Sequence, residues 1–202
     1  MKRINVIALI ACQMIPVTAY AQAGPAFDCA KAGSSAEKLV CDDPALAALD
    51  RRLAERFGEA LTVAKGLDAG AKEAEDLLRA TQRGWIKGRD ECWKEPDLRS
   101  CVHTEYLRRE AELVAGSMLE EPSEVREWKC GDGMRRLTIY TFDTELPAIR
   151  VEEGDSIYTG ALLSADTPGA FYVSQWGDVS LGDGTAQVSD VYGKTSDCRP
   201  AG

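Results

Sequence analysis

Seven cysteines and one histidine are the residues of this chain with the most distinctive chemistry. Cys12 lies in an N-terminal apolar stretch, and the remaining six are even in number. Paired thiols become disulfides in an oxidising compartment, so an exported chain with six cysteines predicts crosslinks. No two cysteines stand at CxxC spacing and His103 is alone, which argues against a zinc site. The six cysteines are Cys29, Cys41, Cys92, Cys101, Cys130 and Cys198.

The same residue types argue against catalysis. His103 follows Cys101 by two residues, but a disulfide-bonded cysteine cannot act as the nucleophile of a Cys/His pair. No Gly-rich phosphate-binding loop is present. Adjacent acids such as Glu120-Glu121 are most simply solvated charge. We therefore predict a protein that is not an enzyme and needs no metal or cofactor.

The first residues predict a signal peptide over residues 1–23. Lys2 and Arg3 supply its charge, an apolar core follows, and small residues near position 21 form a cleavage site. Leu9-Ile10-Ala11-Cys12 has the residue types of a lipoprotein box, but so little sequence precedes it that we favour a chance cysteine over a lipid anchor. No later segment reaches the roughly 20 apolar residues of a membrane span. We expect a periplasmic or secreted protein.

The charge of the mature chain is acidic. Without Lys2 and Arg3, the 24 basic residues become 22 against 33 acidic ones, a net charge of −11. Nucleic acid is a poor partner for such a surface, because phosphate contacts need clustered Lys and Arg. Long-range attraction favours a cationic partner instead.

Residues 24–120 carry a helical pattern. Asp42 or Asp43 can cap a helix with Pro44 in its first turn, and apolar residues follow at spacings of three and four. Breaks by glycine and proline predict two more helices, from Ala71 to about Asp90 and from Asp97 onward. We predict a bundle of three antiparallel helices with two disulfides. Cys92 and Cys101 flank a turn and could pair locally, or each could reach back to Cys29 or Cys41; the spacing leaves the pairing open.

A set of spaced residues in this half resembles the N-terminal domain of LprI-type lysozyme inhibitors over residues 27–113. The resemblance implies an exported disulfide-bonded module. We interpret its Trp85, Gln82 and Arg89 as structural, with Arg89 expected to pair with a carboxylate such as Asp50. The matching residues are Phe27-Asp28-Cys29, Glu37, Cys41, residues 44–50, Gln82-Arg83-Gly84-Trp85, residues 89–92, Cys101 and Tyr106.

Residues 121–202 change to short runs rich in Thr, Val, Ile and Tyr, separated by Gly and Asp. The pattern predicts seven strands with hairpin turns, and hence a small antiparallel barrel or sandwich. A Cys130–Cys198 bridge would fasten its first strand to the C-terminus. The predicted fold class is therefore α+β in two modules, a disulfide-bonded helical bundle followed by a small antiparallel β-barrel.

This second half resembles, more loosely, the membrane-bound inhibitor of c-type lysozyme (the MliC type) over residues 125–199. The resemblance implies that a Ser-Gly-x-x-Tyr loop and a second loop with a basic residue plug the lysozyme cleft. The candidates here are Gly169 and Tyr172, which match, together with Pro168 in place of the serine and Asp183 in the second loop. The cleft of a lysozyme works through two carboxylates, so Asp183 would be repelled where a basic residue would be attracted.

Together these features predict an exported inhibitor that binds and blocks lysozyme, c-type before other classes, aided by its acidic charge. The alternative is a noncatalytic envelope protein that binds another periplasmic partner without inhibiting lysozyme. The absent serine and basic residue favour this alternative for the barrel loops.

Overall fold

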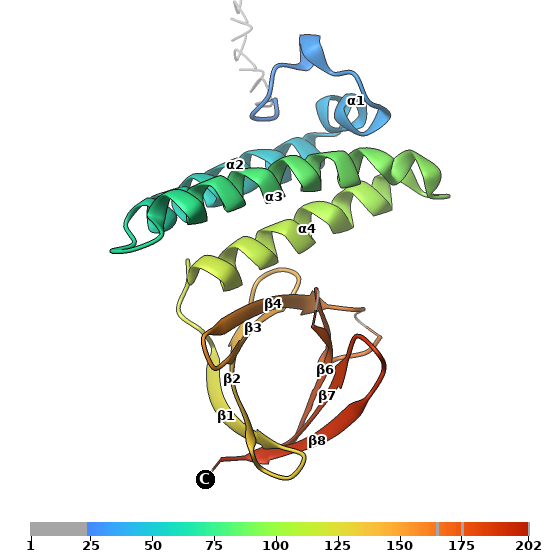
Figure 1. Ribbon diagram of the computed structural model, residues 1–202. Coiled ribbons are helices and arrows are strands. Elements are labelled where there is room, and N and C mark those ends of the chain that lie inside the picture. The colour runs from blue at the N-terminus through green and yellow to red at the C-terminus, as the bar shows by residue number, and fades with distance from the viewer. Residues whose placement is uncertain (1–23, 165, 175, 202) are drawn as a thin grey trace, which may run out of the picture.

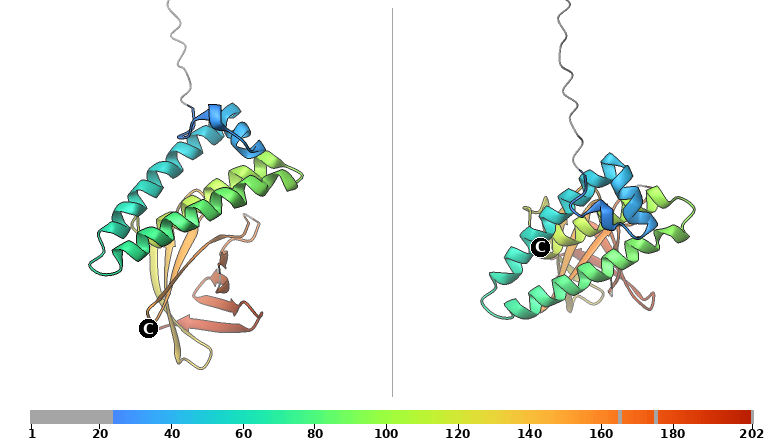
Figure 2. Two further views of the ribbon diagram at one scale, coloured as in Figure 1. Left: turned by 45° about the horizontal axis from the view of Figure 1, so that its top comes forward. Right: turned by 90° about the horizontal axis from the view of Figure 1, so that it is seen from above.

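The computed structural model describes residues 24–164, 166–174 and 176–201. Within these residues, four α-helices precede a closed barrel of eight antiparallel strands, which confirms the predicted α+β class in two modules (Figure 1). The predicted signal peptide and Cys12 lie outside the described residues. None of the described helices is long and apolar enough to cross a membrane. The helices lie across one side of the barrel (Figure 2).

The helices begin and end where local chemistry dictates. Asp43 accepts hydrogen bonds from the amides of Ala45 and Leu46 at the start of α2, with Pro44 in its first turn. Asp97 caps α4 in the same way, because the first amides of a helix have no partner within it. The elements are η1 (Cys29–Lys31), α1 (Ser35–Asp42), α2 (Pro44–Lys65), α3 (Ala71–Asp90), η2 (Glu91–Lys94) and α4 (Leu98–Ser117).

The prediction of three helices missed α1. Ser34 accepts a hydrogen bond from the Glu37 amide, while the Glu37 carboxylate accepts one from the Ser34 amide, and this capping box starts the helix. The Ser-x-x-Glu spacing is a recognised start signal, so the sequence did contain the information. The helix is only eight residues long and is held by tertiary packing of Ala36 and Val40.

Two local disulfides fasten the helical module. Cys29 is bonded to Cys41, which ties η1 to α1, and Cys92 is bonded to Cys101, which ties η2 to α4. Of the pairings that the spacing left open, the structure has the two with the shortest loops. These crosslinks stabilise the ends of short elements that have little apolar surface of their own.

The barrel is a simple up-and-down meander that closes between its first and last strands. Its strands are β1 (Glu124–Cys130), β2 (Arg135–Phe142), β3 (Ala148–Glu153), β4 (Ser156–Leu162), β5 (Ala170–Val173), β6 (Gly177–Gly182), β7 (Thr185–Asp190) and β8 (Thr195–Pro200). Cys130 and Cys198 are register partners and are joined by a disulfide. The prediction of seven strands missed β8, because only Cys198 of its six residues is buried and the sequence shows no apolar alternation there.

Alternate residues of the strands fill the barrel. Trp128, Ile139 and Val151 point inward and are almost completely buried. Strand side chains alternate between faces, so the neighbouring residues point outward. On most of the barrel these outward residues meet solvent, but on β2, β3 and β4 they meet α4.

Helix α4 joins the two modules through a shared core. It lies between the other helices and the barrel (Figure 1), and its small residues allow a close approach to the outer face of β2, β3 and β4. Arg150 of β3 also donates a hydrogen bond of 3.0 Å to the Gly116 carbonyl. The modules therefore form one packed unit. The shared core consists of Ala111, Val114, Ala115, Phe142, Ala148 and Ala161.

Candidate functional site

The polar residues of the LprI-like motif form a buried network. The Arg89 guanidinium donates to the Tyr106 hydroxyl at 2.9 Å, and that hydroxyl donates to a carboxylate oxygen of Asp50 at 2.8 Å. The other oxygen of Asp50 accepts from the Ala26 amide at 2.7 Å. Arg89 pairs directly with a carboxylate, as expected, but its partner is Asp90 at 2.8 Å, and it reaches Asp50 only through Tyr106. Burial raises the pKa of Tyr106 and keeps its hydroxyl protonated.

The remaining motif residues hold α3 against α4. The indole of Trp85 donates to the Glu105 carbonyl at 3.1 Å and packs edge-on against Tyr106. Gln82 accepts from Arg109 at 2.9 Å. Arg89 and Tyr106 are only 3% and 1% exposed, so neither presents a surface to a partner. This group acts in folding and in anchoring the N-terminal segment.

The two barrel loops singled out by the sequence lie side by side at one end of the barrel. The Leu181 amide donates to the Gly169 carbonyl at 2.8 Å, which joins the end of β6 to the loop before β5. Gly169 has a φ of +80°, and a Cβ there would lie 2.3 Å from the Leu181 carbonyl oxygen. Gly169 is therefore required by the backbone. Pro168 and Asp183 are exposed.

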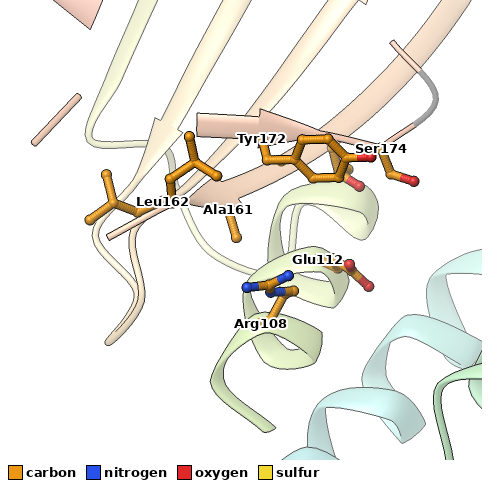
Figure 3. Close-up of a pocket in the computed structure, with 9 residues that line it drawn as sticks. Arg108, Glu112, Ala161, Leu162, Tyr172 and Ser174 are labelled. Carbon is orange, nitrogen blue, oxygen red and sulfur yellow. The ribbon is translucent and has the colours of Figure 1, made fainter. Parts of the chain in front are cut away.

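Tyr172 lies away from these loop tips. It is the register partner of Ala161 on the outer face of the barrel, and its side chain is about half exposed. Its ring lines a pocket where β4 and β5 meet α4 (Figure 3). The structure therefore brings Pro168, Gly169 and Asp183 to one end, and places Tyr172 at the junction of the two modules.

The junction pocket contains an arginine that the sequence did not single out. Arg108 and Glu112 of α4 face the Ala161–Leu162 stretch of β4, with Tyr172 and Ser174 beside them (Figure 3). The pocket has a volume of about 110 Å³. Within the described part of the chain, the Nε atom of Arg108 is buried and has no hydrogen-bond partner. Native proteins pair most buried polar groups, so this atom needs an explanation.

An ion-pair cluster braces the junction on another side. Arg52 of α2 donates to Glu110 of α4 at 2.6 Å and to Glu145 of the β2–β3 loop at 2.7 Å. Arg56 contacts Glu110 as well, and also Glu120 in the segment that leads into β1. Because Glu110 is buried and carries two cationic partners, the cluster fixes how the helices sit on the barrel.

Comparison with known proteins shows what the chain is similar to. Residues 29–121 match the family model described as "Lysozyme inhibitor LprI". The chain is also similar to proteins named "Lipoprotein LprI" from Mycobacterium bovis and Mycobacterium tuberculosis, with 28% identity over 200 residues, covering 97% of this chain and 95% of those proteins. The similarity to these relatives therefore extends through the barrel. No solved structure matches the chain.

Proposed function

We propose that this protein is an exported, noncatalytic inhibitor that binds and blocks lysozyme, with the c-type enzymes as the first target, because residues 29–121 match the family model of the LprI lysozyme inhibitors. The family match is the observation that carries the proposal. The similarity to the two "Lipoprotein LprI" relatives over almost their whole length supports a role for the complete two-module chain.

Charge supports a basic partner. The net charge of −11 that remains without the two leader cations would attract a cationic protein from a distance. Several arginines of the described structure, including Arg52, Arg89 and Arg135, are already engaged by carboxylates of the same chain. Exposed acids such as Asp183 are therefore the groups that meet a partner. Such attraction mainly raises the association rate and weakens as salt screens it.

The loops at one end of the barrel are the proposed contact. Pro168 and Asp183 are exposed there, and Gly169 holds their two loops together. Asp183 would be repelled by the two cleft carboxylates of a lysozyme. We therefore expect this end to bind basic residues around the cleft instead of inserting into it. We place Tyr172 outside this contact, because its ring lines the junction pocket.

The proposal is tested by a cell-wall lysis assay with the full mature chain and a c-type lysozyme. We expect inhibition that becomes weaker between about 0.01 M and about 0.15 M salt, over which the Debye length falls from about 30 Å to about 8 Å. If an equimolar amount of the mature chain does not inhibit lysis at any salt concentration, the proposal is refuted. A g-type lysozyme run in parallel shows whether the protein distinguishes enzyme classes.

The second candidate is a noncatalytic envelope protein with a different periplasmic partner. The observation in its favour is that Pro168 and Asp183 stand where the MliC-type loops carry a serine and a basic residue. Lack of inhibition of both lysozyme classes by a folded protein would favour this candidate.

A further inference from the structure

A large apolar groove lies where the helical module meets the barrel. The end of the α2–α3 hairpin, the last turns of α4 and the outer face of β4 line it, and its volume is about 900 Å³. Leu77 and Ile157, on opposite walls, are 65% and 53% exposed. Ligand pockets are commonly about 300–1,000 Å³, mostly apolar, and found at domain interfaces. The groove has each of these properties. The other apolar residues that line it include Val63, Ala64, Leu67, Leu78, Leu113 and Met118.

The charged residues that line the groove already have hydrogen-bond partners within the protein. Arg109 donates to Gln82, Thr81 and Glu112 at 2.9–3.2 Å. Arg150, at the barrel wall, donates to Glu152 and to the Gly116 carbonyl. A bound peptide would bring amide and carbonyl groups that need partners, since leaving them unpaired carries a penalty. The walls therefore suit an occupant that is apolar along its length.

The junction pocket of Figure 3 adjoins this groove. Glu112, Thr159 and Ser174 line both spaces. The guanidinium of Arg108 faces the junction pocket, and its Nε is the buried atom without a partner in the described residues. Glu112 is engaged by Arg109 at 3.0 Å, so it competes weakly for Arg108. The hydroxyl groups of Tyr172 and Ser174 are further donors in the pocket.

Glu105 is a second acidic neighbour of Arg108 on α4. Glu105 lies one turn earlier on α4 and is half buried, and its pKa is raised chiefly because burial disfavours the carboxylate. Its attraction to Arg108 lowers that pKa only in part, and within the described residues no carboxylate lies within ion-pair distance of Arg108. A guanidinium beside an apolar groove, with no carboxylate partner among the described residues, is the arrangement that recognises an anionic amphiphile.

We propose that this protein binds a medium-chain fatty acid, with the hydrocarbon chain in the groove and the carboxylate held by Arg108, Tyr172 and Ser174. The proposal does not depend on lysozyme binding, because the groove and the loops around Pro168 and Asp183 are separate surfaces. It explains the exposed apolar walls, the cations along them that already have partners, and the arginine at one end that has no carboxylate partner among the described residues.

Isothermal titration calorimetry on the full mature chain tests the chain-length requirement. Octanoate, decanoate and laurate are titrated below their micellar concentrations. Each buried methylene should strengthen binding about three- to fourfold, which is the value of its transfer from water. Dodecyltrimethylammonium has a hydrocarbon chain one methylene longer than that of laurate and a cationic head, and should still bind at least about tenfold more weakly because a charge-assisted hydrogen bond is lost. Equal affinities across the series, or no binding of laurate, would overturn the proposal.

Matched variants test the two parts of the site. Arg108→Gln should weaken laurate binding about tenfold or more and leave dodecyltrimethylammonium binding unchanged or improved; Arg108→Lys should recover part of the loss. Leu77→Gln should weaken both ligands, while Val191→Gln, at an exposed apolar position of the β7–β8 turn, should weaken neither. Thermal unfolding confirms that each variant is folded. Unchanged laurate affinity in a folded Arg108→Gln variant contradicts the headgroup assignment and with it the proposal.

Discussion

Replacing Tyr106 by phenylalanine tests the buried network of the helical module. The ring would keep its packing, but the hydroxyl that accepts from Arg89 and donates to Asp50 would be gone. Tyr106 is 1% exposed, so water cannot easily replace the hydroxyl. One oxygen of Asp50 and one nitrogen of Arg89 would lose a partner, although Asp50 keeps Ala26 and Arg89 keeps Asp90.

The magnitude follows from those two lost partners. Leaving a buried polar group unsatisfied costs about 1–3 kcal/mol, and the contacts that remain place the expected loss for Tyr106→Phe at about 2–4 kcal/mol. Urea unfolding followed by circular dichroism measures it as a lower midpoint with an unchanged m-value. Tyr192→Phe is the matched control, because Tyr192 is 93% exposed and should change stability by less than about 0.5 kcal/mol.

The pH dependence provides an independent check on the same residue. Tyr106 has a folded-state pKa raised above its ordinary value of 10.0, because burial disfavours the phenolate. The native state therefore holds this proton when the unfolded chain releases it, so stability is fully present below about pH 10 and falls as the pH rises further. The Tyr106→Phe variant should lack this part of the alkaline loss. A variant as stable as the wild type, with the same alkaline profile, would refute the reasoning.

Three further predictions concern the barrel. Asp183→Lys should weaken lysozyme inhibition about tenfold, because it sets a cation against the basic residues around the cleft, whereas Asp155→Lys, the same change in the β3–β4 turn at the opposite end, should not; equal effects of the two would show that only net charge matters. The pKa of Glu153 is lowered, first by its hydrogen bond from Arg135. Its contribution to stability, up to about 1 kcal/mol, is therefore present above about pH 4.5 and is lost as the pH falls through the lowered pKa. Glu153→Gln should flatten the acid limb of a stability–pH curve, and an unchanged limb would contradict this. Replacing Cys130 and Cys198 by serine opens a loop of 68 residues and should lower stability by about 4 kcal/mol. The same replacement of Cys29 and Cys41, whose separation is 12, should cost less. Equal losses for the two pairs would count against the chain-entropy explanation.

Much of the fold was predictable because it depends on neighbours in the chain. The caps at Asp43 and Asp97, the glycine breaks and the alternation of the strands are local signals, and they located most helices and seven strands. The α-helix and the strand that were missed, α1 and β8, are short. Their own residues bury little apolar surface, so their conformation depends on the partners that they pack or pair with.

The candidate site was less predictable, because its residues come from different modules. Gly169 and Asp183 were singled out by resemblance, and the structure shows that Gly169 is needed for the backbone and Asp183 is exposed. Arg108 gave no signal in the sequence. Its environment is created by β4 and β5, more than 50 residues later in the chain, and neither strand can be docked on α4 from periodicity alone.

By itself the sequence determined the two modules, their secondary structure types and the acidic charge, and its six cysteines predict an oxidising compartment, since each depends on composition or local spacing. Only the tertiary structure decided which cysteines pair, that Tyr106 stands between Arg89 and Asp50, and that α4 shares a core with the barrel. The physical reason is that these contacts join residues far apart in the chain. Their geometry is fixed by packing of whole elements, which no local pattern encodes.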